Sequence, residues 1–322
     1  MSESSSYFMA TDVLDWLMQG DPSIRYLTSK DILEDTKDDI HSHRMFVDVE
    51  GWGKAFLDKQ GEDGKWDGKF VTPEYTSTVW VLTELRRLGL PRDNYNAKKA
   101  ADLLLDAGLQ KDGGINFAES GEKESEVCHS ALVLSALSYF RVVNPRREAI
   151  FEYLIESQLD DGGWNCNWKS NPESSSFDTT ITVLEALREY AKVTKGDSTY
   201  INMLQAQAQE FLLKHHLYLK SDESNEPVDE NFLTLTYPTY SKYDILTALD
   251  YFQSINHPYD QRFEEAILSL KRRREGGKWK METSHQGQTW IEMEEQHSPS
   301  RWLTLRGIRV INWWERVTKY KF

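Results

Sequence analysis

Apolar residues recur at helical spacing in paired segments along the chain, and a polar turn separates the members of most pairs. Residues 147–159 form one apolar-periodic segment, an Asp-Asp-Gly-Gly-Trp turn follows at 160–164, and residues 176–191 form the second segment. Glycine suits this turn because it adopts left-handed backbone conformations without a steric penalty. The pattern predicts a helix, a tight turn, a loop and a second helix.

The same unit recurs about every fifty residues. The turn glycines Gly64, Gly114 and Gly163 lie 50 and 49 residues apart, and Gly277 follows 114 residues later, which leaves room for two units, one of them enlarged. The predicted helical pairs are 11–18 with 21–33, 44–60 with 79–89, 97–109 with 125–140, 147–159 with 176–191, 201–216 with 240–254, and 262–274 with 300–314. Such a period is typical of arrays of helical hairpins.

The two ends of this array predict that it closes into a ring. The first pair lacks the turn motif, and the last segment carries the apolar residues Ile308, Val310 and Ile311, so neither end offers a polar cap. The second helices are the more apolar members and should form the inner layer. We therefore predict an all-α (α/α)6 toroid, one domain over 1–322, with residues 1–10 flexible and 11–40 holding the first pair.

Composition narrows the partners and the compartment. The chain has 38 basic and 52 acidic residues, a formal charge of −14, which opposes binding to nucleic acid or to an anionic membrane surface. Cys128 and Cys166 are too few for a disulfide framework, and their positions give no basis for a bridge, so reduced thiols are expected. Without a signal peptide or an apolar run of membrane-spanning length, a cytoplasmic protein is expected.

The repeated Gly-Gly-Trp turns before helices that start with Thr or Ser resemble the terpenoid cyclase and protein prenyltransferase β-subunit superfamily. Residues 60–66 and 158–164 look like the Gln-Trp motifs of squalene cyclases, and residues 20–26 and 300–306 are similar to squalene-cyclase-like bacterial proteins of uncertain function. The resemblance covers 51–314. It implies a helical toroid around a cavity for an isoprenoid or similar apolar molecule.

The chain departs from that superfamily at the residues that carry its chemistry. The acidic Asp-x-Asp-Asp segment of squalene-type cyclases matches Ser175, Ser176, Phe177 and Asp178, where only the last carboxylate remains. The Asp-Asp-x-x-Asp motif of class I terpene synthases and the zinc ligands of prenyltransferases have no match. No metal or cofactor is therefore predicted, and whether the chain is an enzyme stays open.

The candidate site is the mouth formed by the inner-helix N-termini and the loops before them. The candidate catalytic carboxylates are Asp178, Asp244 and Glu126. The candidate ligand-binding residues are Tyr75, Cys128, His129, Trp168, Phe177, Tyr240, Tyr243, Trp290, Arg301 and Trp302. Aromatic faces stabilise carbocations and stack on sugars, so this set suits either class of ligand.

Each candidate also has a purely structural interpretation. Asp178 is more simply a helix N-cap, although burial beside aromatic rings would make it an acid, and Asp244 allows the same two interpretations. Cys128 and His129 are neighbours on a helix and point about 100° apart, which disfavours a shared metal site or a nucleophilic pair. Basic residues such as Arg306 more simply form a solvated or salt-bridged face than an anion site.

Three functions follow, in order of preference. The first is a terpenoid-cyclase-like protein that binds an isoprenoid in an aromatic-lined central cavity, with proton-initiated cyclisation or isomerisation as its reaction. The second is a carbohydrate hydrolase or lyase in which Glu126 and Asp178 act as acid and base. The third is a non-catalytic interaction scaffold, which predicts a filled centre.

Overall fold

The computed structural model describes residues 11–118, 124–170, 172–194, 198–221, 224–239, 242–284 and 287–319. Residues 1–10, which were expected to be flexible, and Tyr240 lie outside these ranges. The described residues are mostly helical, which agrees with the predicted all-α class. The α-helices are α1 (Thr11–Met18), α2 (Pro22–Thr28), α3 (Lys37–Arg44), α4 (Gly51–Leu57), α5 (Thr78–Arg87), α6 (Tyr95–Gly108), α7 (Val127–Tyr139), α8 (Arg147–Glu156), α9 (Phe177–Ala191), α10 (Thr199–Lys214), α11 (Ile245–Ser254), α12 (Glu264–Arg272) and α13 (Arg301–Lys319).

Shorter elements connect these helices. A π-helical turn, η1 (Ser29–Leu33), continues α2, and three 3-10 turns are η2 (Trp168–Ser170), η3 (Glu230–Leu233) and η4 (Gln261–Phe263). Strands β1 (Trp279–Lys280) and β2 (Pro299–Ser300) pair antiparallel, with Trp279 opposite Ser300. None of the described helices is both long and apolar enough to span a bilayer.

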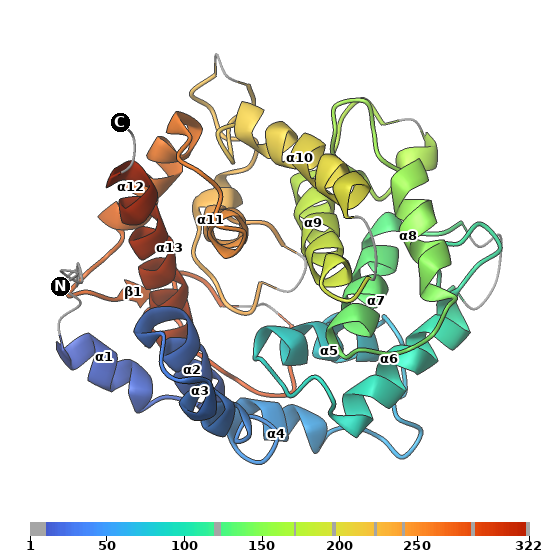
Figure 1. The fold of residues 1–322 in the computed structure, drawn as a ribbon, viewed down its shortest axis with the longest axis horizontal. Helices are drawn as coiled ribbons and strands as arrows, with labels where there is room; N and C mark the ends of the chain where they lie inside the picture. The colour runs from blue at the N-terminus through green and yellow to red at the C-terminus, as the bar shows by residue number, and fades with distance from the viewer. Residues whose placement is uncertain are drawn as a thin grey trace.

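The helices surround the centre of the molecule in two layers. Helices α2, α5, α7, α9, α11 and α13 lie around the centre, and α1, α4, α6, α8, α10 and α12 lie outside them (Figure 1). Neighbouring inner helices contact one another from α5 through α7, α9 and α11 to α13, and α13 also contacts α2. The last helix therefore packs beside the first part of the chain.

The turn tryptophans fasten each outer helix to its inner partner. Trp66, Trp164 and Trp279 are fully buried. Each indole N–H donates to a carbonyl near the end of the preceding outer helix, those of Phe56, Leu154 and Leu270, at 2.7–2.8 Å. Each backbone N–H donates to a threonine hydroxyl of the following inner helix, in Thr78, Thr180 and Thr304, at 3.0–3.1 Å. These paired bonds explain why Trp and Thr recur at the same positions of the repeat.

The glutamines that precede two of these turns reach the next hairpin. The side-chain amide of Gln158 donates to Gly162 O at 2.7 Å and to Leu204 O, on the next outer helix, at 3.2 Å. Gln60 donates in the same way to Gly64 O at 2.8 Å and to Asn96 O at 3.3 Å. One side chain thus closes its own turn and joins two successive hairpins.

One predicted helix is shorter than expected, and one helix was not predicted. The segment 44–60 was expected to be a single helix, yet α4 begins only at Gly51, whose positive φ of 67° is incompatible with a continuous helix. The preceding helix α3 buries none of its residues, so it has no apolar stripe that the sequence pattern could reveal.

The two cysteines correct another expectation. Cys128, at the start of α7, and Cys166, after the turn at Trp164, were expected to be separate reduced thiols. Their sulfur atoms are paired as a disulfide, and their Cα atoms lie 5.7 Å apart. The loop after one turn passes beside the N-terminus of the neighbouring inner helix, and sequence spacing does not reveal that proximity.

Candidate functional site

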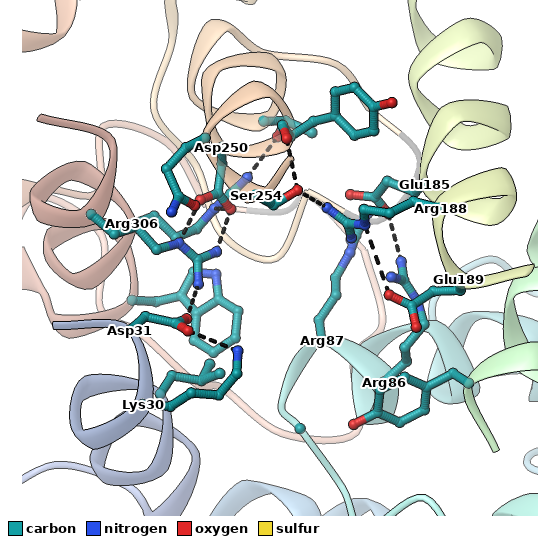
Figure 2. Close-up of a pocket in the computed structure, with 18 of the residues that line it drawn as sticks. Lys30, Asp31, Arg86, Arg87, Glu185, Arg188, Glu189, Asp250, Ser254 and Arg306 are labelled. Carbon is teal, nitrogen blue, oxygen red and sulfur yellow. Dashed lines mark hydrogen bonds and ion pairs between the residues drawn. The ribbon is translucent and has the colours of Figure 1, made fainter. Parts of the chain in front are cut away.

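A cavity of about 380 Å³ lies among the inner helices (Figure 2). Its lining comes from the C-terminal parts of α5, α7 and α9, from both ends of α11, from α2 with η1, from the end of α3, from the first half of α13, and from the loops after α5 and before α11. The cavity therefore reaches the C-terminal ends of α5, α7, α9 and α11 and also the starts of α11 and α13, whereas the sequence places the site at the N-terminal ends alone.

The cavity lining is rich in cations. Among the described residues of the lining, nine basic side chains face four acidic ones, an excess of five positive charges in a chain of net charge −14. The basic residues are Lys30, Arg44, Arg86, Arg87, Arg92, Arg188, Lys192, Arg306 and Arg309, and the acidic residues are Asp31, Glu185, Glu189 and Asp250. The aromatic lining residues are Tyr26, Tyr139, Tyr237, Tyr251 and Trp302. The charged lining differs from the aromatic, apolar lining that the sequence predicted.

On one side of the cavity, α13 and η1 form a wall of paired charges, the α13 wall (Figure 2). Arg306 donates to Asp250 at 3.0 Å, and Arg309 binds both carboxylate oxygens of Asp250 and reaches Asp31 at 2.8 Å. Lys30 lies 2.7 Å from Asp31. Burial alone would raise the pKa of Asp250, but Arg309 and Arg306 outweigh it and hold that pKa below its usual range.

On the opposite side, α5 and α9 form a second wall, the α5/α9 wall. Arg86 donates to Glu185 at 2.5 Å, while Arg87 pairs with Glu84 at 2.9 Å and approaches Glu185 only to 4.0 Å. Burial would raise the pKa of Glu185, but Arg86, Arg87 and Arg188 hold it well below its usual range. Glu185 is therefore a carboxylate whose charge is already shared among several guanidinium groups.

The remaining cations of the α5/α9 wall share Glu189. Lys192 lies 2.7 Å from this carboxylate, whereas Arg92 and Arg188 lie 3.4 and 3.8 Å away. Arg188 also donates to the Ser254 hydroxyl on α11. The Nε atoms of Arg86 and Arg188 are buried and have no hydrogen-bond acceptor in the described part of the chain. Unmatched guanidinium donors thus occur on this wall.

Helix ends contribute further charge to the cavity. The last residues of α5, α7, α9 and α11 are Arg87, Tyr139, Ala191 and Ser254, and the cavity lies at this end of all four helices. The free carbonyl groups of a helix C-terminus act as roughly half a negative charge. They stabilise the nearby cations without neutralising the whole excess.

The predicted acid Asp244 is a buried helix cap next to this cavity. Its Oδ1 accepts the Thr247 N–H at 2.6 Å, and its buried Oδ2 has no hydrogen-bond partner among the residues that the structure describes. Burial raises the pKa of Asp244, and Arg306 and Arg87 partly oppose that rise. Arg306 also donates to the Thr247 hydroxyl at 3.2 Å, so Thr247, a lining residue, links the acid to the cavity.

Asp178 does not cap its helix, which corrects the simpler of the two interpretations. The N-cap is Ser176, whose hydroxyl accepts the Thr179 N–H. Asp178 instead accepts the Tyr243 N–H at 2.6 Å and so joins the starts of α9 and α11. Burial raises the pKa of Asp178, and the hydrogen bond from Tyr243 opposes it.

Glu126 and His129 meet in a second pocket. This pocket, of about 740 Å³, lies between residues 65–72 and the start of α7, with the stacked rings of Phe70 and Phe117 in its lining. Glu126 lies 3.0 Å from His129 Nδ1, and this hydrogen bond lowers the pKa of Glu126. Cys128, between these two residues in sequence, pairs with Cys166 and does not line this pocket.

The predicted aromatic residues are mostly structural. The Phe177 ring packs against the rings of Tyr243, Phe211 and Phe232 at centroid distances of 5.2–5.3 Å, and so fills space beside α9 and α10. The Tyr243 hydroxyl donates to Leu217 O at 2.6 Å. This aromatic cluster is part of the core.

The other predicted ligand-binding residues are spread over the molecule. Trp168 donates to the Tyr153 hydroxyl and Trp290 donates to Thr76 O, at 2.9 and 2.8 Å. Tyr75 packs against Trp80, and Arg301 donates to Trp16 O at 2.9 Å. Of the predicted residues that the structure describes, Trp302 is the one that lines the central cavity, where it stacks on Tyr237 at 4.4 Å.

Sequence reasoning missed most of the cavity lining, although a signal was present. Charged residues interrupt otherwise apolar inner helices, as Glu84, Arg86 and Glu189 do, and all three are buried. Arg306 was considered and assigned to a solvated or salt-bridged face. It is salt-bridged, but it is only 7% exposed and faces the cavity.

Comparison with known proteins finds distant similarity. No family model matches the chain, and neither does any curated protein. Similar solved structures include the type II terpene cyclase MstE from Scytonema in its apo form, with a TM-score of 0.46 and 17% identity over 93% of this chain and 89% of that chain. An MstE variant in complex with geranylgeranyl dihydroxybenzoate has a TM-score of 0.44 and 17% identity, over 93% of this chain and 88% of that chain. Similarity this distant tells nothing about the ligand or the reaction of this chain.

Proposed function

We propose that this protein binds a small organic anion in its central cavity. One observation carries the proposal: the described cavity lining has nine basic and only four acidic residues, although the chain as a whole is strongly acidic. Buried cations without enough counter-charge are costly, and a bound anion supplies that charge. An uncharged ligand would leave the excess uncompensated and remove water from it.

The aromatic residues of the lining suit the organic part of such a ligand. The stacked rings of Tyr237 and Trp302, 18° from parallel, form an apolar surface in the same cavity. The isoprenoid ligand predicted from the sequence fits this lining best when it carries an anionic head group. A short prenyl diphosphate combines both chemistries.

We also propose that the six hairpins form a closed (α/α)6 toroid in a single domain, of the terpenoid-cyclase-like kind. The contact of α13 with α2 supports closure. If the ligand is converted, we assign the proton-donor role to Asp244, because its burial favours the protonated acid and Thr247 links it to the cavity. Asp178 lines neither of the two pockets described above.

Isothermal titration calorimetry with three related ligands tests the binding proposal. Inorganic pyrophosphate and dimethylallyl diphosphate are expected to bind, the latter more tightly because its prenyl group adds apolar contact. Dimethylallyl alcohol, which has the same prenyl group without charge, is expected not to bind. Equal affinity for the alcohol and the diphosphate would favour a purely apolar site, and no heat with any of the three would contradict the proposal.

The two alternative functions have less support. An acid and base pair made of Glu126 and Asp178 requires a common cleft, but Glu126 lines the second pocket and Asp178 does not. A scaffold predicts a filled centre, and the inner helices enclose a cavity.

A further inference from the structure

We propose that the anionic group of the ligand binds to the α5/α9 wall and that this group is a phosphate-type anion of two or more negative charges, such as a phosphate ester or diphosphate. This inference rests on the proposed anion-binding function and adds the place and the charge of the bound group. It follows from the unequal way in which the two walls of the cavity satisfy their cations.

The α13 wall leaves little capacity for a ligand. The Nε and both terminal nitrogens of Arg309 donate hydrogen bonds to Asp250 and Asp31. Arg306 uses Nε on Asp250 and a terminal nitrogen on Thr247. Each carboxylate on this wall is in hydrogen-bond contact with two basic residues.

The α5/α9 wall is under-compensated. Glu189 accepts a close hydrogen bond from Lys192 at 2.7 Å and a long one from Arg92 at 3.4 Å, while Arg188 stays 3.8 Å away. Arg188 directs a terminal nitrogen at a neutral hydroxyl, that of Ser254. Arg87 approaches Glu185 only to 4.0 Å. An anion here would gain charge-assisted hydrogen bonds that the protein's own carboxylates do not provide.

The charge balance indicates an anion of two or more negative charges. The lining carries five excess positive charges, and Glu84, which pairs with Arg87, reduces the excess to four. The C-termini of α5, α7, α9 and α11 each contribute roughly half a negative charge, and the starts of α11 and α13, which supply Thr247 and Trp302 to the lining, each contribute roughly half a positive charge, which leaves an excess of about three. A phosphate monoester carries between about 1.5 and 2 negative charges near neutral pH.

Two matched lysine variants test the location. Lys192 and Lys30 lie on opposite walls, each pairs with one carboxylate at 2.7 Å, and their side chains are 48% and 47% exposed. Lys192→Gln is expected to weaken pyrophosphate binding by about threefold to tenfold, as loss of one charge-assisted contact does. Lys30→Gln is expected to weaken it by about twofold at most, because its carboxylate partner already engages Arg309.

Arg188→Gln provides the stronger test, with an expected loss of about tenfold or more in pyrophosphate affinity. The unfolding midpoint of each variant shows whether it is folded, and Lys192→Gln keeps the test decisive if Arg188→Gln is unfolded. A loss on Lys30→Gln equal to or larger than that on Lys192→Gln would overturn the location. Failure of the wild-type protein to bind pyrophosphate would instead reject the anion-binding function itself.

A series of anions tests the charge. Acetate, sulfate and pyrophosphate are titrated at constant ionic strength, and affinity is expected to rise steeply from the monovalent to the divalent ion. Acetate binding as tightly as sulfate or pyrophosphate would contradict the assignment of an anion of two or more negative charges. Weaker binding of both multivalent ions to Lys192→Gln than to wild type would support the assignment to the α5/α9 wall.

Discussion

Glu294 is a carboxyl group whose pKa is shifted close to neutrality. Its carboxylate accepts the Trp302 N–H at 2.9 Å at the start of α13, the helix that carries Arg306 and Arg309. Burial raises its pKa from 4.5 to about 7, against the opposing effect of that hydrogen bond. The folded protein therefore binds a proton at Glu294 more tightly than the unfolded chain does.

This shift predicts a pH dependence of stability. Between about pH 4.5 and 7, the unfolded chain has lost the proton and the folded chain has not, so stability falls as the pH rises through this window, by roughly 3 kcal/mol at most. Glu294→Gln is expected to flatten this slope in urea unfolding at pH 5 and pH 7.5. The exposed Glu292→Gln should leave the slope unchanged, and a steep slope in the Glu294 variant would contradict the assignment.

Asp244 allows its charge and its capping role to be separated. Asn keeps an oxygen for the Thr247 N–H, whereas Ala removes it, so Asp244→Ala is expected to lose about 1–2 kcal/mol of unfolding free energy. Asp244→Asn is expected to lose much less and to gain relative to wild type as the pH rises, since burial disfavours the charged carboxylate. Urea unfolding measures both, and equal losses for Asn and Ala would show that the carboxylate itself is required.

At the scale of elements, glycine in the turns allows neighbouring hairpins to pack closely. Gly162 has a φ of +95°, and a Cβ there would lie 2.6 Å from the carbonyl oxygen of Gln207 on the next outer helix. Gly276, in the turn between α12 and β1, has a φ of +55°, but a Cβ there would meet nothing within 4 Å. Gly162 is required both for its left-handed backbone conformation and for the close approach of Gln207, whereas Gly276 is required for its conformation alone.

The two glycines therefore form a matched pair of test sites. Gly276→Ala is expected to lower the free energy of unfolding by about 1–2 kcal/mol, because the Cβ of alanine is strained in a left-handed backbone conformation. Gly162→Ala is expected to cost more, because it adds a clash with backbone of the neighbouring hairpin. Chemical denaturation compares the two directly, and equal losses would show that the close approach of Gln207 has no energetic weight.

At the scale of the whole molecule, two side chains of α13 join the last helix to the start of the chain. Arg309 donates to Asp31 at 2.8 Å, and Arg301 donates to Trp16 O at 2.9 Å while its guanidinium lies over the Trp16 ring. The buried faces of α13 and α2 meet at the same place. These contacts bring together segments almost three hundred residues apart.

Loss of this junction should reduce global stability. Asp31→Ala is expected to cost about 1–3 kcal/mol, because Arg309 keeps Asp250 but loses one charge-assisted partner in a partly buried site. The exposed Asp93→Ala is the control and should change the unfolding free energy by no more than about 0.5 kcal/mol. Equal effects of the two substitutions in urea unfolding would mean that the ion pair does not stabilise the junction.

The sequence alone determined the helical pairs and their turns. These features depend on interactions between residues close in the chain, such as helical periodicity in α9 and left-handed glycine at Gly64 and Gly162, and local spacing records them. Segments without an apolar stripe, such as α3, left no comparable signal. The candidate acid Asp244 could be found because it stands at the start of a recognisable helix.

The tertiary structure decided where the cavity lies among the inner helices and which residues line it. Arg86, Glu185, Asp250 and Arg309 come from four helices spread over more than two hundred residues, and their spacing along the chain carries no information on the face they share. The pairing of Cys128 with Cys166 is set in the same way by the packing of a loop against α7. Interactions between residues close in the chain determine the hairpins, and only the arrangement of the hairpins around the centre brings the basic side chains together.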